Sequence, residues 1–422
     1  MKKTSRRAVM MRRRRVALLI DFSRAYGRAI LLGVAKFVRE HHEWSVQSEE
    51  WRWTDGIPAW FRNWTGDGAI VWVETQEQAD IVRQFGVPAV DVRGSVGNCR
   101  LPLIDTENQI VANLAAEDLM QRGFQNYAFC GFVSANYSDI RGKFFQERLA
   151  REGFSCAVYQ PPEISLNVQT LELEKRGLLF QEHLAHWLKS LPKPVGVMAC
   201  NDIRGQQVMN ACRRCELTVP EELAVIGVDN DEIFCELSDP PLSSVALDTL
   251  RIGYEAAALL ERMMAGEKAP GQPILIPPLG VVARRSTDVL VMDDRQLAVG
   301  ARFLREHAFD SITVNDAARA AGMSRRVFER RFSSQMGRAP KAEVLRIRLE
   351  RAKSLLANTD WPLTKIAERT GFKHGGYLHA VFGDKTGMTP GQFRKQAKLE
   401  SKRHWDTQRG EGTEHRSRRK AR

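Results

Sequence analysis

The sequence predicts an α/β part with parallel β-sheets, followed by an all-α part. Short apolar runs of strand type alternate with segments of helical periodicity from residue 16 to residue 288. From Asp293 onward no strand-like run follows, and helical patterns separated by Gly and Pro continue to about Lys398. The length of 422 residues also exceeds one compact domain, since domains usually hold roughly 100–200 residues.

Seven apolar runs in the first part have the length and composition of buried strands. Between them, Val111–Met120, Lys143–Arg151 and Gly205–Cys215 have helical spacing. Such alternation indicates one or two parallel sheets covered by helices on both faces, in which ligands bind beyond the carboxyl ends of the strands. The expected strands are Val16–Ile20, Ala69–Val73, Val87–Val92, Tyr127–Phe132, Phe154–Tyr159, Val195–Ala199 and Ala224–Val228.

The net charge of +12 is distributed unevenly along the chain. Residues 1–15 contain eight Lys or Arg and no acidic residue, and residues 289–422 contain 29 Lys or Arg against 15 Asp or Glu. Residues 16–288 therefore carry a balance of −10. Basic charge gathered at the two ends indicates contact with a polyanion there. With 43% apolar and 27% charged residues, collagen-like, disulfide-rich and wholly disordered proteins are excluded.

The seven cysteines are an odd number spread along the chain, which is typical of reduced thiols. Cys212 and Cys215 have CxxC spacing without a second pair, so we interpret them as two residues of an ordinary helix. The apolar run after the N-terminal arginines ends at Asp21 after five residues. Because no stretch reaches the roughly 18 apolar residues of a membrane span, we expect a cytoplasmic protein with no membrane partner.

The all-α part contains an internal repeat with an offset of 49–50 residues. Each half has a helix, a turn that contains glycine, and a second helix, as in a helix-turn-helix motif. A small Ala lets the two helices approach, and Gly takes the turn that a side chain would obstruct. The recurring pairs are Ala318 and Ala367, Gly322 and Gly371, Phe332 and Phe382, Gly337 and Gly387, and Pro340 and Pro390.

The second helix of the first half has the residue types of a DNA-reading helix. Ser324 stands at the N-cap position, and Phe328 and Phe332 recur at the core spacing of four. A helical bundle with a solvated basic face is the alternative, but two matching halves and the basic balance argue against it. The helix carries Arg325, Arg326, Arg330 and Arg331.

These residues resemble the AraC-type DNA-binding domain over about 100 residues. The resemblance implies two helix-turn-helix units bridged by a long helix at about Lys341–Ala357, with two recognition helices in neighbouring major grooves. The matching residues are Phe328–Phe332, Gly337, Pro340, Arg348, Ala352, Leu355, Leu356, Ile366, Ala367, Gly371, Phe372, Gly387–Pro390, Phe393 and Arg394.

The second unit departs from the family pattern. Gly375 and Gly376 stand where its recognition helix begins, and Leu378 and Gly383 replace an aromatic and a basic residue. Two glycines cost about 1 kcal/mol each inside a helix. We therefore expect the first unit to contribute more to base reading, and it remains open whether the second reads bases. The predicted DNA contacts are Ser324, Arg325, Arg326, Arg330, His374 and His379.

Residues 16–288 resemble the sugar-sensing domain of LacI-type repressors, which is similar to periplasmic sugar-binding proteins. Only fifteen residues precede the first strand, so no LacI-type N-terminal helix-turn-helix is expected. This combination with a C-terminal AraC-type domain is similar to the family of xylose-operon regulators, along nearly the whole chain. The matching segments are Ile104–Asn108, Arg122–Phe124, Cys200–Asp202, Val219–Pro220, Val225–Asn230, Leu242–Val245 and Arg284–Thr287.

The resemblance implies four segments. We expect a basic N-terminal arm over 1–15 and a two-lobed, periplasmic-binding-protein-like α/β domain with parallel sheets over 16–288. An AraC-type all-α domain with a double helix-turn-helix should occupy 289–398 and a disordered basic tail 399–422. The arm and the tail are expected to attract phosphates without sequence specificity.

Polar residues follow the predicted strands at the edge where a sugar would bind. Sugar hydroxyls need partners because an unpaired buried hydroxyl costs about 1–3 kcal/mol, and Asp, Asn, Arg and an aromatic face supply them. Helix or loop capping is the alternative for Asn201, Asp202, Asp229 and Asn230. Trp44, Trp51, Trp53, Trp60 and Trp64 are expected to be mostly core or interface. The predicted ligand contacts are Ser23, Arg24, Tyr26, Glu74, Arg141, Asn201, Asp202, Asp229 and Asn230.

The sequence favours a sugar-responsive transcription factor over an enzyme. It contains no P-loop, no G-x-G-x-x-G, no G-x-S-x-G and no metal-spaced His/Cys set, so no catalytic residue, metal or cofactor is predicted. The resemblance implies a homodimer that binds operator DNA and D-xylose, with activation when the lobes close. The effector, the operator sequence, the sign of regulation and the oligomeric state remain open. The alternatives are a different effector, or a carbohydrate-binding α/β enzyme with a fused helical module.

Overall fold

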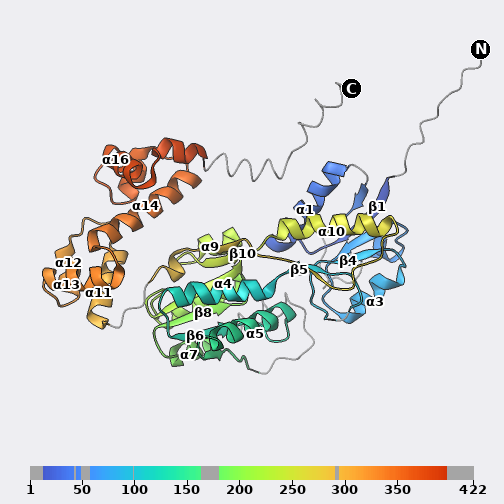
Figure 1. Ribbon diagram of the computed structural model, residues 1–422, viewed down its shortest axis with the longest axis horizontal. Helices are drawn as coiled ribbons and strands as arrows, with labels where there is room; N and C mark the ends of the chain where they lie inside the picture. The colour runs from blue at the N-terminus through green and yellow to red at the C-terminus, as the bar shows by residue number, and fades with distance from the viewer. Residues whose placement is uncertain are drawn as a thin grey trace, which may run out of the picture. The chain divides into compact units, whose positions relative to one another are not determined.

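The computed structural model describes residues 13–41, 44–48, 58–97, 99–162, 180–289 and 294–396. The chain divides into two compact units, Met1–Asp288 and Val289–Arg422, and each is described by itself (Figure 1). The predicted tail over 399–422 lies outside the described residues. So do Trp51 and Trp53, two of the five tryptophans considered above as core or interface residues.

The first unit consists of two lobes, and lobe 1 is built on a four-stranded parallel sheet in the order β2-β1-β3-β4. Helix α10 returns to this lobe from far along the chain and packs against α1. The strands are β1 (Arg14–Leu19), β2 (Trp44–Gln47), β3 (Gly68–Val71) and β4 (Ala89–Asp91). The helices are α1 (Ala25–His41), α2 (Ala59–Arg62), α3 (Gln76–Gln84) and α10 (Thr249–Met264).

Lobe 2 contains a six-stranded sheet in the order β12-β10-β9-β8-β6-β7, in which only β12 runs antiparallel. Its strands are β6 (Asn126–Cys130), β7 (Cys156–Val158), β8 (Val195–Ala199), β9 (Leu223–Asp229), β10 (Ser243–Ala246) and β12 (Gly280–Val282). Its helices are α4 (Asn108–Gln121), α5 (Asn136–Ala150), α7 (Gln181–Ser190), α8 (Asp202–Arg214) and α9 (Glu232–Leu237).

The described chain crosses between the lobes at three places. It crosses from β5 (Ile104–Thr106) to α4, from β10 to α10, and from β11 (Ile274–Ile276) to β12. Strands β5 and β11 pair in parallel, which ties two of the crossings together. The two lobes thus lie with the carboxyl ends of their strands toward the crossings, which is where parallel sheets bind ligands. The predicted two-lobed α/β fold is confirmed.

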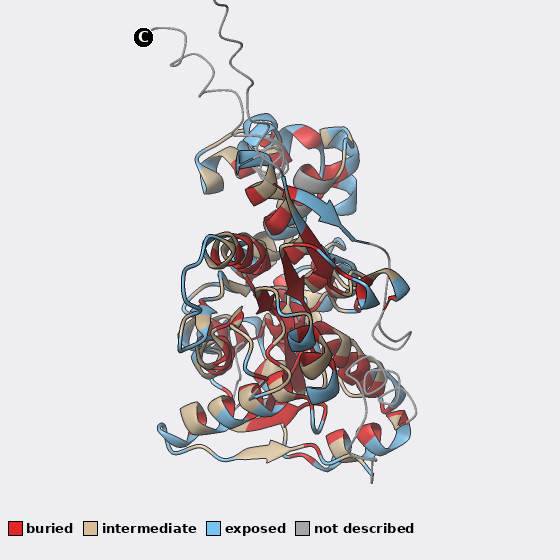
Figure 2. Ribbon diagram, turned by 90° about the vertical axis from the view of Figure 1, so that its right-hand side faces the viewer, coloured by how far each residue is buried: buried red, intermediate tan, exposed pale blue. Residues whose placement is uncertain are grey.

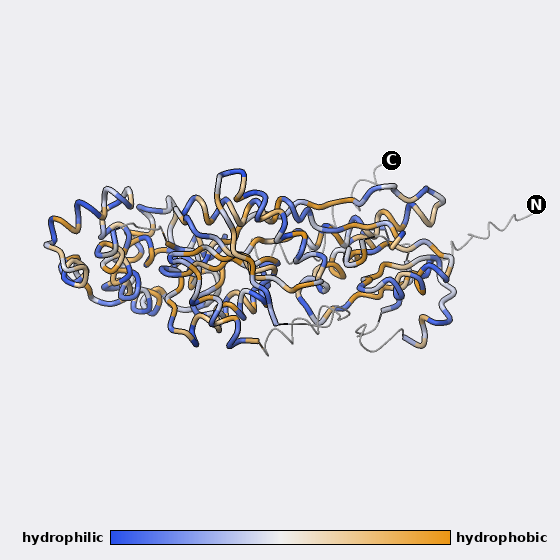
Figure 3. The backbone as a smooth tube through the Cα atoms, turned by 90° about the horizontal axis from the view of Figure 1, so that it is seen from below, coloured by the Kyte–Doolittle hydropathy of each residue, from blue (hydrophilic) through white to orange (hydrophobic). Residues whose placement is uncertain are grey.

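The central strands of both sheets, such as β3, β8 and β9, are buried along nearly their whole length because helices cover both faces. Ile70 in lobe 1 and Val225 and Ile226 in lobe 2 are fully buried. Figure 2 shows the central strands in red, with helices beside them whose outer faces are tan or pale blue. In Figure 3 hydrophobic stretches, in orange, alternate with hydrophilic ones along the chain. Each fully buried aliphatic side chain contributes about 1.5–3 kcal/mol. Of the tryptophans, Trp44 and Trp64 belong to the lobe-1 core, as expected.

The first strand begins two residues inside the predicted N-terminal arm over 1–15, of which residues 1–12 lie outside the described residues. Strand β1 begins at Arg14, because the ladder with β2 extends through Arg14 and Arg15, which pair with Trp44 and Ser45. The guanidinium of Arg14 lies 3.2 Å from a carboxylate oxygen of Glu261 on α10. These two arginines are therefore strand residues and not part of a free arm.

The second unit is helical throughout its described residues. Its helices are α11 (Arg295–Glu306), α12 (Val314–Ala320), α13 (Arg325–Met336), α14 (Pro340–Asn358), α15 (Leu363–Arg369) and α16 (Gly375–Thr386). The predicted repeat is present as α12-turn-α13 and α15-turn-α16, and the expected bridging helix is α14. Gly322 and Gly371 take the two turns with φ of +64° and +71°, a backbone conformation that favours glycine.

Candidate ligand pocket and nucleic-acid interface

A pocket lies between the strand ends of the two lobes and encloses about 790 Å³ of empty space, the solvent at its mouth included. Eight of the nine predicted ligand contacts line it; Asn230 does not. The lining residues are Asp21, Ser23, Arg24, Ala25, Tyr26, Trp72, Glu74, Arg93, Asp105, Tyr137, Arg141, Asn201, Asp202, Ile203, Asp229, Asp231 and Phe234.

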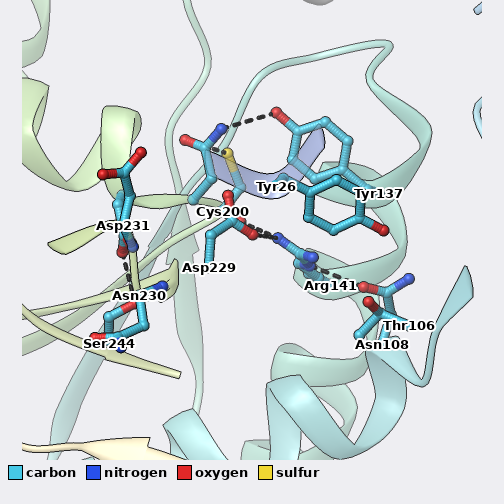
Figure 4. A network of polar contacts seen from close by, with 12 residues as sticks. Tyr26, Thr106, Asn108, Tyr137, Arg141, Cys200, Asp229, Asn230, Asp231 and Ser244 are labelled. Carbon is cyan, nitrogen blue, oxygen red and sulfur yellow. Dashed lines mark hydrogen bonds and ion pairs between the residues drawn. The ribbon is translucent and has the colours of Figure 1, made fainter. Parts of the chain in front are cut away.

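Arg141 of α5 is the centre of a buried polar network (Figure 4). Its Nε donates to Asn108 Oδ1 at 2.8 Å, and its Nη1 donates to the carbonyl oxygen of Cys200 at 2.6 Å. Nη1 also lies 3.7 Å from Asp229 Oδ1, and the guanidinium stacks 5.1 Å from the ring centre of Tyr137. Arg141 therefore joins the start of α4 to the ends of β8 and β9, and only 4% of its side chain is exposed.

The side chains of Asn201 and Asp202 accept hydrogen bonds from backbone N–H groups, as expected if these residues cap a helix and a loop. The side-chain oxygen of Asn201 accepts from the N–H of Arg204 at 2.9 Å and caps α8. The carboxylate of Asp202 accepts from Ser244 Oγ at 2.6 Å and from the N–H of Asp231 at 2.7 Å. Burial, followed by repulsion from the nearby Asp229 carboxylate, raises the pKa of Asp202 well above its ordinary value.

Asp229 and Asn230 form a turn of positive φ, +106° and +53°, at the end of β9. Such backbone is uncommon outside glycine and is found at binding sites more often than elsewhere. Asp229 lines the pocket, whereas the N–H of Asn230 donates to Ser244 Oγ at 3.0 Å. The turn directs these two consecutive residues differently, which explains why Asn230 is absent from the lining.

Several lining residues were missed by the sequence analysis. Arg93 follows the predicted strand Val87–Val92 directly, so the strand-end argument applied to every strand would have found it. Trp72 was placed inside the predicted strand Ala69–Val73, whereas β3 ends one residue before it at Val71. Asp105 lies in a segment that carried the LacI-type resemblance, and Tyr137 lies in the first turn of α5. Tyr26, which was predicted, donates to Asp105 Oδ1 at 3.3 Å.

Aromatic rings and charged groups alternate around the pocket. Tyr26 meets Trp72 edge to face at a ring-centre distance of 5.7 Å. Burial raises the pKa of both Tyr26 and Asp105, and the charge of the nearby Asp105 carboxylate raises the pKa of Tyr26 further. Directional acceptors and donors beside apolar ring faces are the groups that bind a polyhydroxylated ring.

The first recognition helix of the second unit has the predicted construction. Ser324 caps α13 by accepting from the N–H of Val327 at 3.4 Å. Phe328 and Phe332 are fully buried, with ring centres 5.5 Å apart. The outer face carries Arg326 and Arg330, both exposed.

Two of the arginines of α13 are engaged within the protein. Arg325 Nε donates to Glu329 Oε1 at 3.0 Å, one turn along the same helix. Arg331 Nη1 donates to Asp294 Oδ2 at 2.9 Å, which joins α13 to the start of α11.

The second recognition helix, α16, accommodates its two glycines. Gly375 and Gly376 lie in the first turn, where the cost of glycine in a helix interior does not apply in full. A Cβ on Gly375 would stand 3.3 Å from the backbone nitrogen of Thr364, so glycine there permits close packing on α15. His374 caps the helix through Nδ1, which accepts from the N–H of Tyr377 at 3.1 Å. His379 is exposed on the same helix.

Both units of the chain match domains of known proteins. Residues 116–287 match the periplasmic binding protein-like domain, and residues 317–396 match the helix-turn-helix domain. The chain is 31% identical over 391 residues to the xylose operon regulatory protein of Escherichia coli (strain K12), which covers 91% of this chain and 97% of that protein. The chain belongs to the family of xylose operon regulatory proteins. The Haemophilus influenzae member is 30% identical over 390 residues, with 90% and 98% covered.

Solved structures agree with this membership. The structure of a xylose-binding transcription activator matches with a TM-score of 0.74 at 31% identity, covering 91% of this chain and 98% of that one. The transcriptional regulator CelR in complex with cellobiose shares the fold alone, with a TM-score of 0.52 at 20% identity over 65% of this chain and 85% of that one.

As a member of the family, the chain is a transcription regulator with a sugar-binding domain and an AraC-type helix-turn-helix domain, and it is not an enzyme. Within the described residues, no three His, Cys, Asp or Glu side chains are grouped to hold a metal ion. Nor does any described helix have the length and apolarity needed to span a membrane.

Proposed function

We propose that this regulator binds D-xylose in the pocket between its lobes and activates transcription in the cytoplasm as a homodimer bound to operator DNA. The observation that carries the proposal is the pocket itself. Donors and acceptors from both lobes converge there, with Arg141 and Asp229 from lobe 2 and Tyr26, Glu74 and Asp105 from lobe 1. A ligand that bonds to both sets favours the closed arrangement by its differential affinity.

The balance of charge in the pocket favours a neutral ligand. Six carboxyl groups line it against three guanidinium groups, so a sugar phosphate or a sugar acid would meet excess negative charge. A neutral ring of hydroxyls bonds to both kinds of group. The relatives add the choice of sugar, since those covering most of the chain are named as xylose operon regulators and the matching solved structure as xylose-binding.

A panel of ligands tests the sugar-binding half of the proposal. Thermal unfolding of the full chain is measured with D-xylose, other monosaccharides and the aldonic acid of D-xylose. A ligand at 100 times its dissociation constant stabilises the folded unit by about 2.7 kcal/mol, so we expect a clear shift with D-xylose and none with the acid. A shift with another sugar alone would discard D-xylose, and no shift with any sugar would contradict the sugar pocket.

Asp229→Asn, a substitution of nearly the same shape, tests whether the Asp229 carboxylate contributes to ligand binding. Asparagine keeps the shape and tolerates positive φ, but it replaces a carboxylate oxygen with an amide donor. We expect weaker D-xylose binding by calorimetry without loss of folding. Asp118→Asn is the control, since Asp118 pairs with Arg122 at the end of α4 and does not line the pocket. Equal affinity in the two variants would contradict a role for Asp229.

For DNA we propose that Arg326 and Arg330 of α13 make the base and phosphate contacts, with His379 on α16. Their exposure on the two recognition helices supports this assignment. We assign Ser324 and His374 the capping of those helices at the DNA surface, and Arg325 a phosphate contact reached by exchanging its bond to Glu329. Closure of the sugar-binding unit is proposed to let both protomers engage tandem half-sites.

Selection of operators from a random DNA library tests the DNA-binding half. Arg326→Ala should relax the preference at one base pair, since a bidentate contact to guanine is worth about 1–3 kcal/mol of discrimination. Arg302→Ala on α11 makes the same charge change outside the recognition helices. If Arg326→Ala instead weakens binding equally for all sequences and lowers the salt dependence, Arg326 contacts phosphate and the base-reading assignment is wrong.

A further inference from the structure

The last residue of β4 is a fully buried carboxylate, Asp91. Its Oδ1 accepts from the backbone N–H of Val73 at 3.2 Å and of Arg93 at 3.1 Å, and its Oδ2 accepts from the N–H of Gly94 at 3.1 Å. Three backbone donors surround the two oxygens, which suits an ionised carboxylate because that group only accepts. Asp91 thereby fixes the path of residues 91–94, named here the β4 turn.

The β4 turn carries two contacts with the opposite lobe. Asn136, the first residue of α5, donates from Nδ2 to the carbonyl oxygen of Gly94 at 2.5 Å. The guanidinium of Arg93 lies between two rings, 4.6 Å from the centre of Trp72 in lobe 1 and 4.8 Å from that of Tyr137 in lobe 2. A desolvated guanidinium is attracted to the electron-rich face of an aromatic ring. The turn therefore links the lobes at the wall of the pocket.

Arg93 is also held from the side of its own lobe. Its Nε lies 3.9 Å from Glu74 Oε1, which accepts from Trp72 Nε1 at 3.1 Å. Arg93, Trp72, Glu74 and Tyr137 all line the pocket. A displacement of the β4 turn would thus change both the contact between the lobes and the surface offered to a ligand.

We propose that Asp91 is a positioning residue for ligand binding, because it shapes the β4 turn that sets Arg93 between Trp72 and Tyr137 and Gly94 on Asn136. Asp91 does not line the pocket and acts through Arg93 and Gly94. The inference rests on the proposed function to the extent that it takes D-xylose as the ligand whose affinity is read out.

Protonation of Asp91 gives the proposal a distinctive readout. Burial raises the pKa of Asp91 to about 7, against the lowering effect of its three backbone hydrogen bonds. The titratable and charged groups around it are Asp105 of β5, whose charge adds to the rise, Cys99, and Arg93 and Glu74 at the ends of β4 and β3. A protonated carboxyl has one oxygen that donates, so it cannot keep all three bonds.

Calorimetric titration of the full chain with D-xylose at pH 6, 7 and 8 tests the proposal. If binding needs ionised Asp91, the competent fraction rises from about one tenth at pH 6 to about nine tenths at pH 8, so affinity should increase about tenfold. Asp91→Asn should bind about tenfold more weakly at pH 8 than the unaltered chain and show no such pH dependence. Asp118→Asn, which makes the same charge change at a residue that does not line the pocket, should keep the full profile.

The outcomes separate this proposal from the choice of ligand. If the unaltered chain binds D-xylose and Asp91→Asn keeps both its affinity and its pH profile, the positioning role is overturned. If no D-xylose binding is seen at all, the proposed function fails, and a second measurement still decides the role of Asp91.

That second measurement is a double-mutant cycle in the ligand-free chain, read by urea denaturation. Arg93→Gln and Tyr137→Leu should be coupled by about tenfold in the unfolding equilibrium constant. The coupling should disappear when Asp91→Asn is added. Absence of coupling, or coupling that survives Asp91→Asn, would overturn the inference.

Discussion

Replacing Glu343 with glutamine tests how the DNA-binding unit is held together. Glu343 of α14 is 1% exposed, and its carboxylate lies 2.6 Å from Arg338 Nε and 2.9 Å from Arg346 Nη2. The Nε of Arg305 on α11 lies 3.9 Å away. One carboxylate thus provides the shared counter-charge of three guanidinium groups. Removing one partner of a buried pair costs about 3–5 kcal/mol, so Glu343→Gln should lose about this much.

Calorimetric melting of the full chain measures this loss. For a domain of roughly 60–100 residues, 1 kcal/mol corresponds to about 4–8 °C in Tm, so the transition of the helical unit should fall by more than about 10 °C. Glu350→Gln is the matched control on the same helix, since Glu350 is exposed and forms an ion pair with Lys353 at 2.8 Å. It should change stability by less than about 1 kcal/mol. Equal small shifts for both variants would refute the reasoning.

The same ion pairs produce a pH dependence of definite sign. Burial by itself would raise the pKa of Glu343, but the bonds to Arg346, Arg338 and Arg305 outweigh burial and lower it. A carboxyl of lowered pKa stabilises the fold above its unfolded pKa and loses that contribution as pH falls through the folded value. The difference in Tm between the unaltered chain and Glu343→Gln should therefore shrink on acidification below about pH 4.5. A difference that grows there would exclude the ion pairs as its cause.

Three further substitutions probe packing and the pocket network. Gly253→Ala places a methyl group 2.0 Å from the carbonyl oxygen of Ile30, so α1 and α10 must separate, and urea denaturation should show a loss of about 1–3 kcal/mol. Phe332→Ala leaves a cavity beneath α13 and should cost about 3–5 kcal/mol in the calorimetric transition of the helical unit. Arg141→Met removes the charged donor to Asn108 and to a backbone carbonyl, and urea denaturation should show a loss of about 3–6 kcal/mol that Arg141→Lys recovers in part.

The strands were predictable because burial on both faces leaves a direct mark in the sequence. Val195–Ala199 is a continuous apolar run, and β8 has those bounds. The same reasoning found Asn201 and Asp229, since each follows the apolar residues of a strand that ends at the pocket. Periodicity and the repeat likewise located α13 and its buried Phe328 and Phe332.

The turns were harder to predict because side-chain direction there depends on backbone dihedrals. Asp229 and Asn230 are adjacent in sequence, yet the positive φ of both separates their directions, and only Asp229 lines the pocket. At the start of α16 the two glycines suggested a weakened helix. His374 caps the helix locally, and the close approach of Gly375 to Thr364 depends on α15, which lies earlier in the chain.

Asp91 shows where sequence reasoning reaches its limit. It lies inside the predicted strand Val87–Val92 and is the last residue of β4, and its neighbours gave no reason to single it out. Its partners are backbone N–H groups, and every residue except proline carries such a group. One of them belongs to Val73, which follows the neighbouring strand β3 and is 18 residues away in the sequence. The order of residue types in the sequence therefore does not indicate this interaction. The residues that touch a ligand can be inferred from their chemistry, but a residue that places them is recognised only from the geometry of the folded chain.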